Sequence, residues 1–228
     1  KIWYFYIKGA LISVKARNSE VVIIKILIGI IGAIYISFLY MDINNIGMYI
    51  SSNNLKFISI ILIFIISIFI RKNPISCNDI HILQAGLFIT IFADLFLLVL
   101  NSHYILGIFL FSIVQILYSI RYDSKSSKSI IRNFIIIFIG LSITYLILNR
   151  FIINIDLLWI VTIFYVICLL NSVRSSIRMY KYKTYPEPNR QMILIGMILF
   201  LLCDINVGLY NITGSILLTG KFINLLYT

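Results

Sequence analysis

The sequence predicts an all-α, polytopic transmembrane helix bundle of about eight spans, with both chain ends on the cytoplasmic side. Three observations predict it: an apolar composition, a series of membrane-length apolar runs, and basic residues gathered in alternate loops. The chain of 228 residues is 61% hydrophobic and 12% charged, and its mean hydropathy is +1.03. A soluble domain of this size cannot hide so much apolar surface, so the surrounding solvent is lipid.

The first expected element is a basic arm over residues 1–20, which mixes aromatic and basic side chains and therefore lies on the membrane surface. Residues 21–228 then form a single transmembrane domain. Strands are excluded because an open sheet leaves unsatisfied edges in lipid, and the runs are too long for barrel strands. The predicted spans are roughly 21–40, 55–70, 80–101, 103–122, 130–149, 156–178, 190–210, and a last one from about 213.

Basic residues predict the orientation, because loops rich in Lys and Arg stay on the cytoplasmic side. Fifteen of the 19 Lys and Arg residues fall in the arm or in and around the loops after spans 2, 4 and 6. The opposite loops contain only Lys56 and Arg150, while Lys25 and Lys221 fall inside predicted helices. This asymmetry predicts an N-in, C-in topology. It also supports the number of spans, since a missed helix would have scrambled it.

The net charge of +11 follows from the same rule and from anionic lipid headgroups, so no nucleic-acid partner is expected. The three cysteines are widely spaced and fit neither a disulfide framework nor a metal cluster. His81 and His103 lie near span ends without a partner at metal-ligand spacing, so no metal and no other cofactor is predicted. Nucleotide-binding, serine-hydrolase and zinc-protease motifs do not occur, which leaves acid–base chemistry.

A pattern of Gly, Asp and Asn in span 3 recurs in span 7. The two copies are Gly86-x7-Asp94-x6-Asn101 and Gly196-x7-Asp204-x6-Asn211, with an offset of 110 residues. The same offset carries span 1 onto span 5 and span 2 loosely onto span 6. It predicts two parallel copies of four helices, a 4+4 repeat about an axis along the membrane normal. Because the offset maps span 4 onto 213–232, we expect the last span to be cut short at Thr228.

Asp94 and Asp204 are the two acidic residues expected inside the membrane, since the other six lie in loops or at span ends. Each lies about fourteen residues into an outward-running helix, which places both about 5 Å beyond the midplane towards the outer leaflet. An acid there costs ~2.5–3.5 kcal/mol on insertion scales and by default marks function. If the two carboxyl groups face each other, repulsion leaves one protonated and one ionised near neutrality, equipped as general acid and general base.

The structural alternative is that each aspartate hydrogen-bonds a neighbouring helix and holds the bundle together. The matched pair favours function over this alternative. Thr90, Asp94 and Asn101 lie on one helical stripe, which supports a shared polar cavity. For Gln115, contact with substrate or an aspartate and simple packing are equally expected. The polar residues expected to surround the two aspartates are Thr90, Asn101, Gln115, Tyr118 and Asn211.

Two segments around these residues carry a resemblance to a known family. The first reads Phe92-Ala93-Asp94-Leu95-Phe96-Leu97-Leu98, then Gly107 and Phe111-x3-Gln115-x2-Tyr118; the second reads Leu199-Phe200-Leu201-Leu202-Cys203-Asp204. They resemble the two signatures of the YhhN-like lysoplasmalogenase family, eight-helix membrane proteins of about this length. The family commonly has His at the position of Gln115, and its closing Tyr-and-Gln segment is absent here.

The resemblance implies hydrolysis of the vinyl-ether bond of a lysoplasmalogen, a lysophospholipid, to a fatty aldehyde and glycerophospho-ethanolamine or -choline. Asp94 and Asp204 would share the acid and base roles, while Gln115, Tyr118 and Asn101 would orient substrate or water. Two rivals stay open: a proton-coupled transporter with the same aspartates as a relay, and a catalytically silent relative that binds lipid. We expect an integral protein of a bacterial cytoplasmic membrane, in contact with membrane lipids. The sequence does not indicate an oligomeric state.

Overall fold

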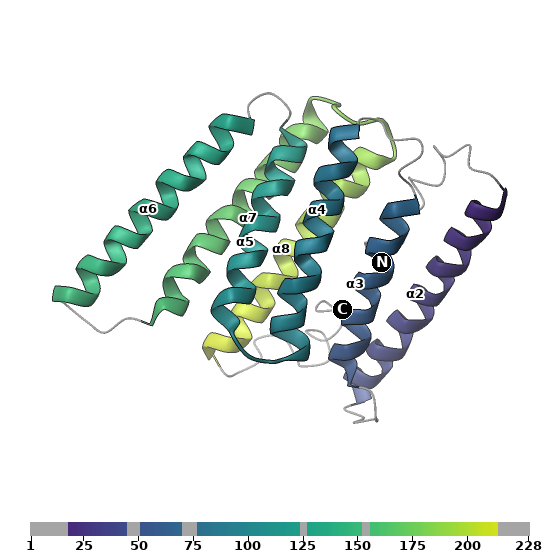
Figure 1. Cartoon of the computed structure of the whole chain (residues 1–228), viewed down its shortest axis with the longest axis horizontal. Coiled ribbons are helices and arrows are strands. Elements are labelled where there is room, and N and C mark those ends of the chain that lie inside the picture. The colour runs from purple at the N-terminus through teal and green to yellow at the C-terminus, as the bar shows by residue number, and fades with distance from the viewer. Residues whose placement is uncertain (1–17, 45–50, 70–76, 124–126, 152–155, 214–228) are drawn as a thin grey trace. The chain divides into compact units, whose positions relative to one another are not determined.

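A computed structural model describes residues 18–44, 51–69, 77–123, 127–151 and 156–213, with side chains up to Ile205 in the last helix. All regular structure in these residues is helical (Figure 1), which confirms the all-α prediction. The elements are α2 (Asn18–Asn44), α3 (Ser52–Phe69), α4 (Cys77–Asp94), the π-helix η2 (Leu95–Val99), α5 (Tyr104–Tyr122), α6 (Ser127–Phe151), α7 (Leu157–Lys181) and α8 (Asn189–Thr213).

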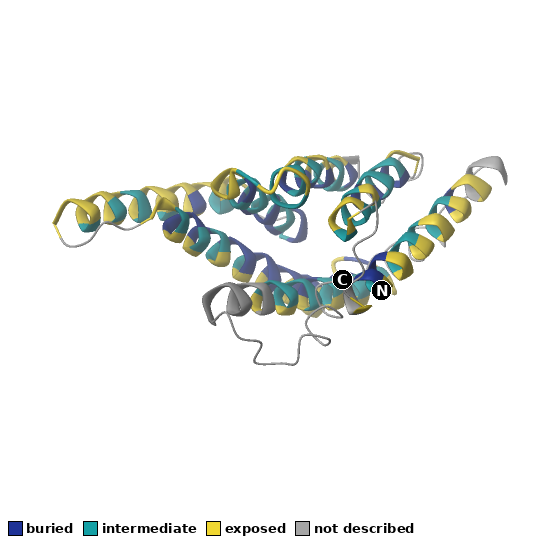
Figure 2. Cartoon of the chain, turned by 90° about the horizontal axis from the view of Figure 1, so that it is seen from below, coloured by how far each residue is buried: buried dark blue, intermediate teal, exposed yellow. Residues whose placement is uncertain are grey.

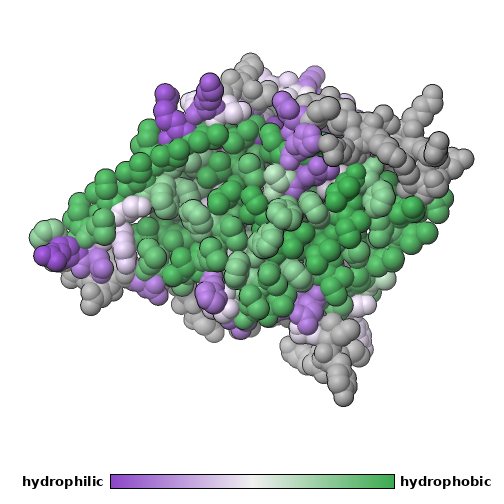
Figure 3. Space-filling view, viewed as in Figure 1, coloured by the Kyte–Doolittle hydropathy of each residue, from purple (hydrophilic) through white to green (hydrophobic). Residues whose placement is uncertain are grey.

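Six of these helical segments are long and apolar enough to cross a membrane, namely 22–41, 52–69, 78–99, 104–122, 127–151 and 157–181. Each lies within a few residues of a predicted span, and α8 covers the seventh predicted span. Hydrophobic side chains cover the bodies of the helices and hydrophilic ones gather near their ends (Figure 3). The protein is therefore a polytopic helical membrane protein. The predicted span from about 213 and the basic arm up to residue 17 lie outside the described residues.

Contacts divide the chain into two compact units, which are described in turn. The first unit comprises residues 1–75 and 183–228 and contains α2, α3 and α8. Ile24 of α2 and Ile66 of α3 are buried against each other, and the Lys56 ammonium lies 5.6 Å from the centre of the Phe38 ring. The first contact joins the start of α2 to the end of α3, and the second joins the end of α2 to the start of α3. The two helices therefore form an antiparallel hairpin.

The second unit comprises residues 76–182 and contains α4, η2, α5, α6 and α7. It takes two predicted spans from each copy of the proposed repeat, so the unit boundaries do not follow the 4+4 division. Within it, α5 packs against both α4 and α7. Asp79 pairs with Arg121 and Leu97 lies against Gly107, so α4 and α5 are antiparallel.

The contact between α5 and α7 runs in parallel, because Phe111 meets Tyr165 and Asp123 meets Arg178. Small buried side chains lie at this contact: Ser119 of α5 accepts a hydrogen bond from Asn171, and Ser172 of α7 donates one to Gln115. Small residues let transmembrane helices approach closely, and the interior gains dispersion contacts and hydrogen bonds in return. The contact between α5 and α7 is therefore both closely packed and hydrogen-bonded.

The outlying helix α6 contacts α7 through aromatic side chains, with the Phe138 and Phe164 rings 5.1 Å apart. Phe134 is its one buried residue within the described part of the chain, and most of α6 is exposed (Figure 2). The exposed side chains are Ile, Leu and Phe, such as Ile136 and Leu146. An apolar helix of this kind suits contact with lipid tails rather than water.

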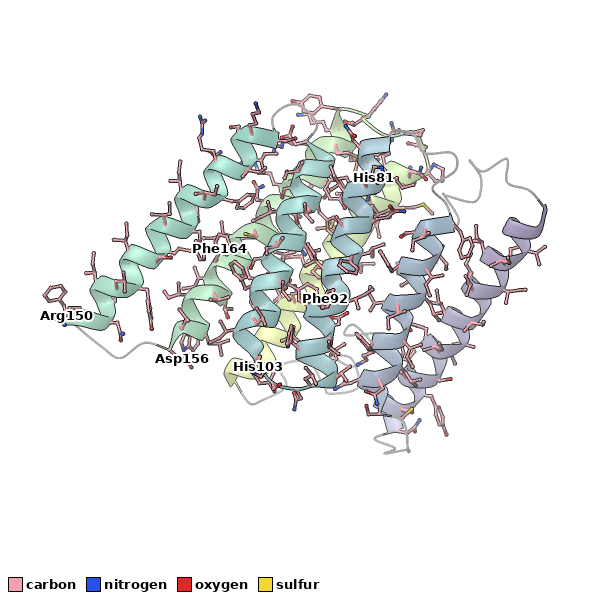
Figure 4. All side chains as sticks on the ribbon, viewed as in Figure 1. His81, Phe92, His103, Arg150, Asp156 and Phe164 are labelled. Atoms are coloured by element: carbon pink, nitrogen blue, oxygen red, sulfur yellow. The ribbon has the colours of Figure 1, made fainter. Side chains whose placement is uncertain are left out.

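The two ends of the second unit differ in charge. His81 lies near one end of α4, whereas His103, Arg150 and Asp156 lie at the opposite end of the unit (Figure 4). The chain alternates direction along α4, α5, α6 and α7, so the ends near His81 also carry Arg121, Lys128, Arg132, Arg178 and Lys181. By the positive-inside rule we assign the His81 end to the cytoplasm and the His103 end to the outer side.

Candidate functional site

Asp94 lies where α4 changes its helical form. The α-helix ends at Asp94 and passes without a break into η2, in which the Leu100 amide donates to the Leu95 carbonyl at 2.9 Å. A π-turn is rare, widens the helix, and is found frequently at functional sites. Counted along the apolar segment 78–99, Asp94 lies about 24 Å from the cytoplasmic end and about 8 Å from the outer end. Asp94 therefore lies nearer the outer end of its apolar segment, and its depth in the membrane stays a prediction.

The Asp94 carboxyl group is partly buried, next to the fully buried Ala93. It forms no hydrogen bond and no ion pair with any residue that the structure describes. An unpaired carboxyl group in hydrocarbon costs several kcal/mol in its ionised form, which is why such groups are rare in transmembrane helices. The structural alternative predicts a hydrogen bond from Asp94 to a neighbouring helix, and none is present among the described residues.

Four other carboxyl groups form ion pairs or hydrogen bonds within the described residues. Asp79 pairs with Arg121, Asp123 with Arg178 and Glu187 with Arg190, and the Asp156 carboxylate accepts from the Leu158 amide at the start of α7. The sequence placed Asp79 at a span end reached by water. The structure instead gives it two bonds with the Arg121 guanidinium, at 2.8 and 3.0 Å, and Arg121 is almost fully buried.

Thr90 lies one turn before Asp94, as expected, and its hydroxyl donates to the Gly86 carbonyl of its own helix at 2.9 Å. Tyr118 of α5 lies against the same turn: a Cβ atom at Gly86 would come within 2.9 Å of the Tyr118 ring. Glycine is thus needed at position 86 for α4 and α5 to approach. The structure thus brings Thr90 and Tyr118 together at the α4–α5 contact. Along α4, Thr90 lies one turn and the Tyr118 contact at Gly86 two turns on the cytoplasmic side of Asp94.

Gln115 is fully buried but faces α7. Its Oε1 accepts a hydrogen bond of 2.6 Å from the Ser172 hydroxyl, which also lies 2.9 Å from the Leu169 carbonyl. One turn further on, Asn171 donates from Nδ2 to the Ser119 hydroxyl at 3.2 Å. Of the two roles expected for Gln115, this geometry favours packing. Ser119, Asn171 and Ser172 were not predicted as partners, because no local sequence pattern shows which helix a buried polar residue will meet.

Asn101 does not continue the stripe of Thr90 and Asp94, so this part of the prediction is wrong. The π-turn shifts the phase of the helix, which ends before Asn101, and Asn101 itself adopts a left-handed conformation with φ 46°. Its side chain is exposed and accepts a hydrogen bond of 2.6 Å from the Tyr104 hydroxyl. Asn101 therefore belongs to the outer turn between the two helices, together with Ser102 and His103.

Asp204 lies in α8, fifteen residues after the first residue of that helix, and is partly buried. The helix stays α-helical to Thr213, so the π-turn that follows Asp94 has no counterpart after Asp204. The two copies of the repeat thus differ locally. The Asn211 side chain lies outside the described residues. Asp94 and Asp204 belong to different units, and their facing across one cavity stays a prediction.

In the part of the chain that the structure describes, no three His, Cys, Asp or Glu side chains lie together in a group that could hold a metal ion. His103 adopts a left-handed conformation with φ 55°, and its Nδ1 lies 3.0 Å from the Ser102 hydroxyl. His81 is exposed near the cytoplasmic end of α4. The two histidines therefore lie at opposite ends of the α4–α5 hairpin, and neither is a sequence neighbour of Asp94.

The comparisons with known proteins agree with the two signatures found in the sequence. The model of the YhhN family matches residues 51–228, from the start of α3 to the end of the chain. The match covers both aspartates and the whole of the second unit. No curated protein and no solved structure matches the chain.

Proposed function

The chain belongs to the YhhN family, and from this premise we propose that it is an intramembrane hydrolase of lysoplasmalogens. The substrate is a lysophospholipid with a vinyl-ether chain, and the products are a fatty aldehyde and glycerophospho-ethanolamine or -choline. The observation that carries the proposal is Asp94, a carboxyl group deep in a transmembrane helix that no described residue binds. The proposed location is the cytoplasmic membrane of a bacterium.

The chemistry of the vinyl ether explains why a carboxyl group suits this task. A proton from a carboxylic acid adds to the β-carbon of the double bond and leaves an oxocarbenium ion at the carbon that bears the oxygen. Water attacks that carbon and loses a proton to a carboxylate, which gives a hemiacetal. The hemiacetal then breaks its bond to the glycerol oxygen, which takes up a proton, and the aldehyde is released. One water molecule is consumed, and the reaction needs one acid and one base.

We assign the acid and base roles to Asp94 and Asp204, without deciding which residue has which role. Glycosidases use two carboxyl groups in a related way, because their transition state also resembles an oxocarbenium ion. Tyr118 of α5 lies against the Gly86 turn of α4, and we give it the role of orienting substrate or water. Gln115 is engaged by Ser172, so its replacement of the family histidine changes packing against α7 rather than the acid–base pair.

A proton-coupled transporter would need a polar path on both sides of Asp94. On the cytoplasmic side of Asp94, the Thr90 hydroxyl donates to the Gly86 carbonyl within α4, and Ser172 of α7 donates to Gln115 of α5. Hydroxyl groups tied to backbone or amide acceptors in a dry interface make a poor proton path. This arrangement favours hydrolysis over transport. A silent lipid-binding relative would release no aldehyde and would move no protons.

The test is the release of fatty aldehyde by the purified protein in lipid vesicles supplied with a lysoplasmalogen. The matched substrate control is the lysophospholipid with a saturated alkyl ether, which cannot form the oxocarbenium ion by protonation. We expect Asp94→Asn and Asp204→Asn each to lower the rate by about 10²–10⁴-fold, as loss of a general acid or base does. Thr144→Ala on the exposed side of α6 is the matched control variant and should keep full activity.

Two outcomes would contradict the proposal. Aldehyde release by Asp94→Asn at the wild-type rate would remove Asp94 from the mechanism. Dissipation of a pH gradient by the wild-type protein, without any aldehyde, would instead support the transporter.

A further inference from the structure

The α4–α5 hairpin is closed at its cytoplasmic end by charge. The Arg121 guanidinium donates a hydrogen bond to each carboxylate oxygen of Asp79. The Arg121 side chain is only 6% exposed, although α5 ends one residue later. Arg178 lies 3.0 Å from the Asp123 carboxylate and links α7 to the end of α5. Two ion pairs therefore join α4, α5 and α7 where the bundle meets the cytoplasm.

Between the cytoplasmic end and mid-membrane, small buried side chains let α5 and α7 approach each other closely. Ser119, Ser172, Ser175 and Ser176 are all fully buried, and the Ser172–Gln115 bond closes the same interface near mid-membrane. A lipid chain or headgroup cannot pass between helices that approach this closely, because doing so would break both packing and hydrogen bonds.

The outer end of the hairpin has a different surface. Burial falls along η2, where the side chains are half-buried, and Val99 and Leu100 are exposed. The turn that follows is polar, with Asn101, Ser102, His103 and the Tyr104 hydroxyl at the level expected of lipid headgroups. The described charged residues at this end of the unit, Arg150 and Asp156, form no ion pair between helices.

Depth decides which leaflet can supply a substrate. The vinyl ether of a lysoplasmalogen is attached to the glycerol, directly below a charged headgroup that is costly to bury in hydrocarbon. Asp94 is about 8 Å from the outer end of its apolar segment but about 24 Å from the cytoplasmic end. A lipid of the outer leaflet thus reaches Asp94 with a small displacement of its headgroup. A lipid of the inner leaflet would have to carry its headgroup about three times as far into the hydrocarbon.

We propose that the enzyme draws its lysophospholipid from the outer leaflet of the membrane, along the outer end of the α4–α5 hairpin. The proposal rests on the proposed function, since it concerns how the substrate reaches Asp94. It adds a specificity that the reaction itself does not require. Of two chemically identical pools of lysoplasmalogen, the protein uses the one that faces away from the cytoplasm.

The experiment delivers the same substrate to one leaflet at a time. The full chain is produced in a bacterial host, and two preparations are made: spheroplasts, which expose the outer leaflet, and inverted vesicles, which expose the inner leaflet. Lysoplasmalogen is added from outside, and the initial rate of aldehyde release is measured before the lipid can cross the bilayer. The same amounts of protein are then assayed after the membranes are dissolved in detergent, and Asp94→Asn membranes give the background rate.

We expect spheroplasts to release aldehyde at least about tenfold faster than inverted vesicles, and the two preparations to become equal in detergent. Equal rates before detergent, or faster release by inverted vesicles, overturn the outer-leaflet proposal while leaving the hydrolase in place. No aldehyde above the Asp94→Asn background in detergent overturns the proposed function, and the leaflet proposal with it. The detergent step therefore separates the two failures.

Discussion

Two polar regions inside the membrane part of the second unit differ in whether their groups have partners. Between α5 and α7, two hydrogen bonds link Asn171 to Ser119 and Ser172 to Gln115. At the end of α4, the carboxyl group of Asp94 can ionise, so its burial costs more free energy than that of a hydroxyl or amide group. It has no partner among the described residues. The cheaper groups are satisfied and the most expensive one is not.

This difference distinguishes polar residues that stabilise a helical bundle from polar residues that serve its function. Polar side chains that stabilise a bundle are paired, since each pair across helices gains about 0.6 kcal/mol on average and an unpaired group gains nothing. A carboxyl group that stays unpaired costs free energy, so its presence calls for another explanation. The π-turn directly after Asp94 and the outer position of this residue are consistent with a reaction site.

The largest effect on stability is expected at the buried ion pair. Asp79→Ala leaves the Arg121 guanidinium buried without its carboxylate, and should lower the free energy of unfolding by about 3 kcal/mol. The measurement is unfolding in mixed micelles by titration with a denaturing detergent. Asp123→Ala is the matched control, because Arg178 is 45% exposed and such pairs contribute less than about 1 kcal/mol. Equal losses in the two variants would show that the Asp79 pair does not close the hairpin.

A smaller loss of stability is expected where Gly107 of α5 packs against Leu97 of η2. A Cβ atom at Gly107 would lie 2.6 Å from Cγ of Leu97, so Gly107→Leu should cost about 1–3 kcal/mol through overpacking. Gly140→Leu is its counterpart on α6, where a Cβ atom meets nothing within 4 Å. It should leave the unfolding free energy unchanged. Loss of stability in both variants would mean that α6 is packed against something on its exposed side.

The smallest effect is expected in the paired polar region. Ser172→Ala removes the hydrogen bond to Gln115 and should cost about 0.6 kcal/mol, with aldehyde release close to the wild-type rate. The expectation follows because the bond lies in the α5–α7 interface and not beside Asp94. A large fall in the rate without a loss of stability would transfer Gln115 and Ser172 from packing to the reaction.

The fold could be predicted because its causes are local in the sequence. Apolar runs of membrane length determine where each helix lies, and the predicted boundaries agree with α2 to α8 within a few residues. Asp94 could also be found, since a single acid stands out in an apolar run. These signals need no knowledge of which helix packs beside which.

The rest depends on tertiary contacts or on local forms without a sequence signal. Asp79 and Arg121 are 42 residues apart, and nothing near either residue shows that they pair. The π-turn of Leu95–Val99 is built from ordinary apolar residues, so the phase shift that removes Asn101 from the stripe was not foreseen. Gln115 was expected either to contact substrate or an aspartate or to serve in packing, and only the structure shows that it meets Ser172 of α7.

The most direct test of the central claim is the unfolding free energy of Asp94→Leu, measured beside that of Gln115→Leu. If Asp94 is present for chemistry, replacing it by an apolar side chain removes an unpaired carboxyl group from the membrane. We predict that Asp94→Leu is at least as stable as the wild-type protein while its aldehyde release falls to background, and that Gln115→Leu is less stable. Asp94→Leu that is destabilised as much as Gln115→Leu would contradict the account, because Asp94 would then hold the bundle together.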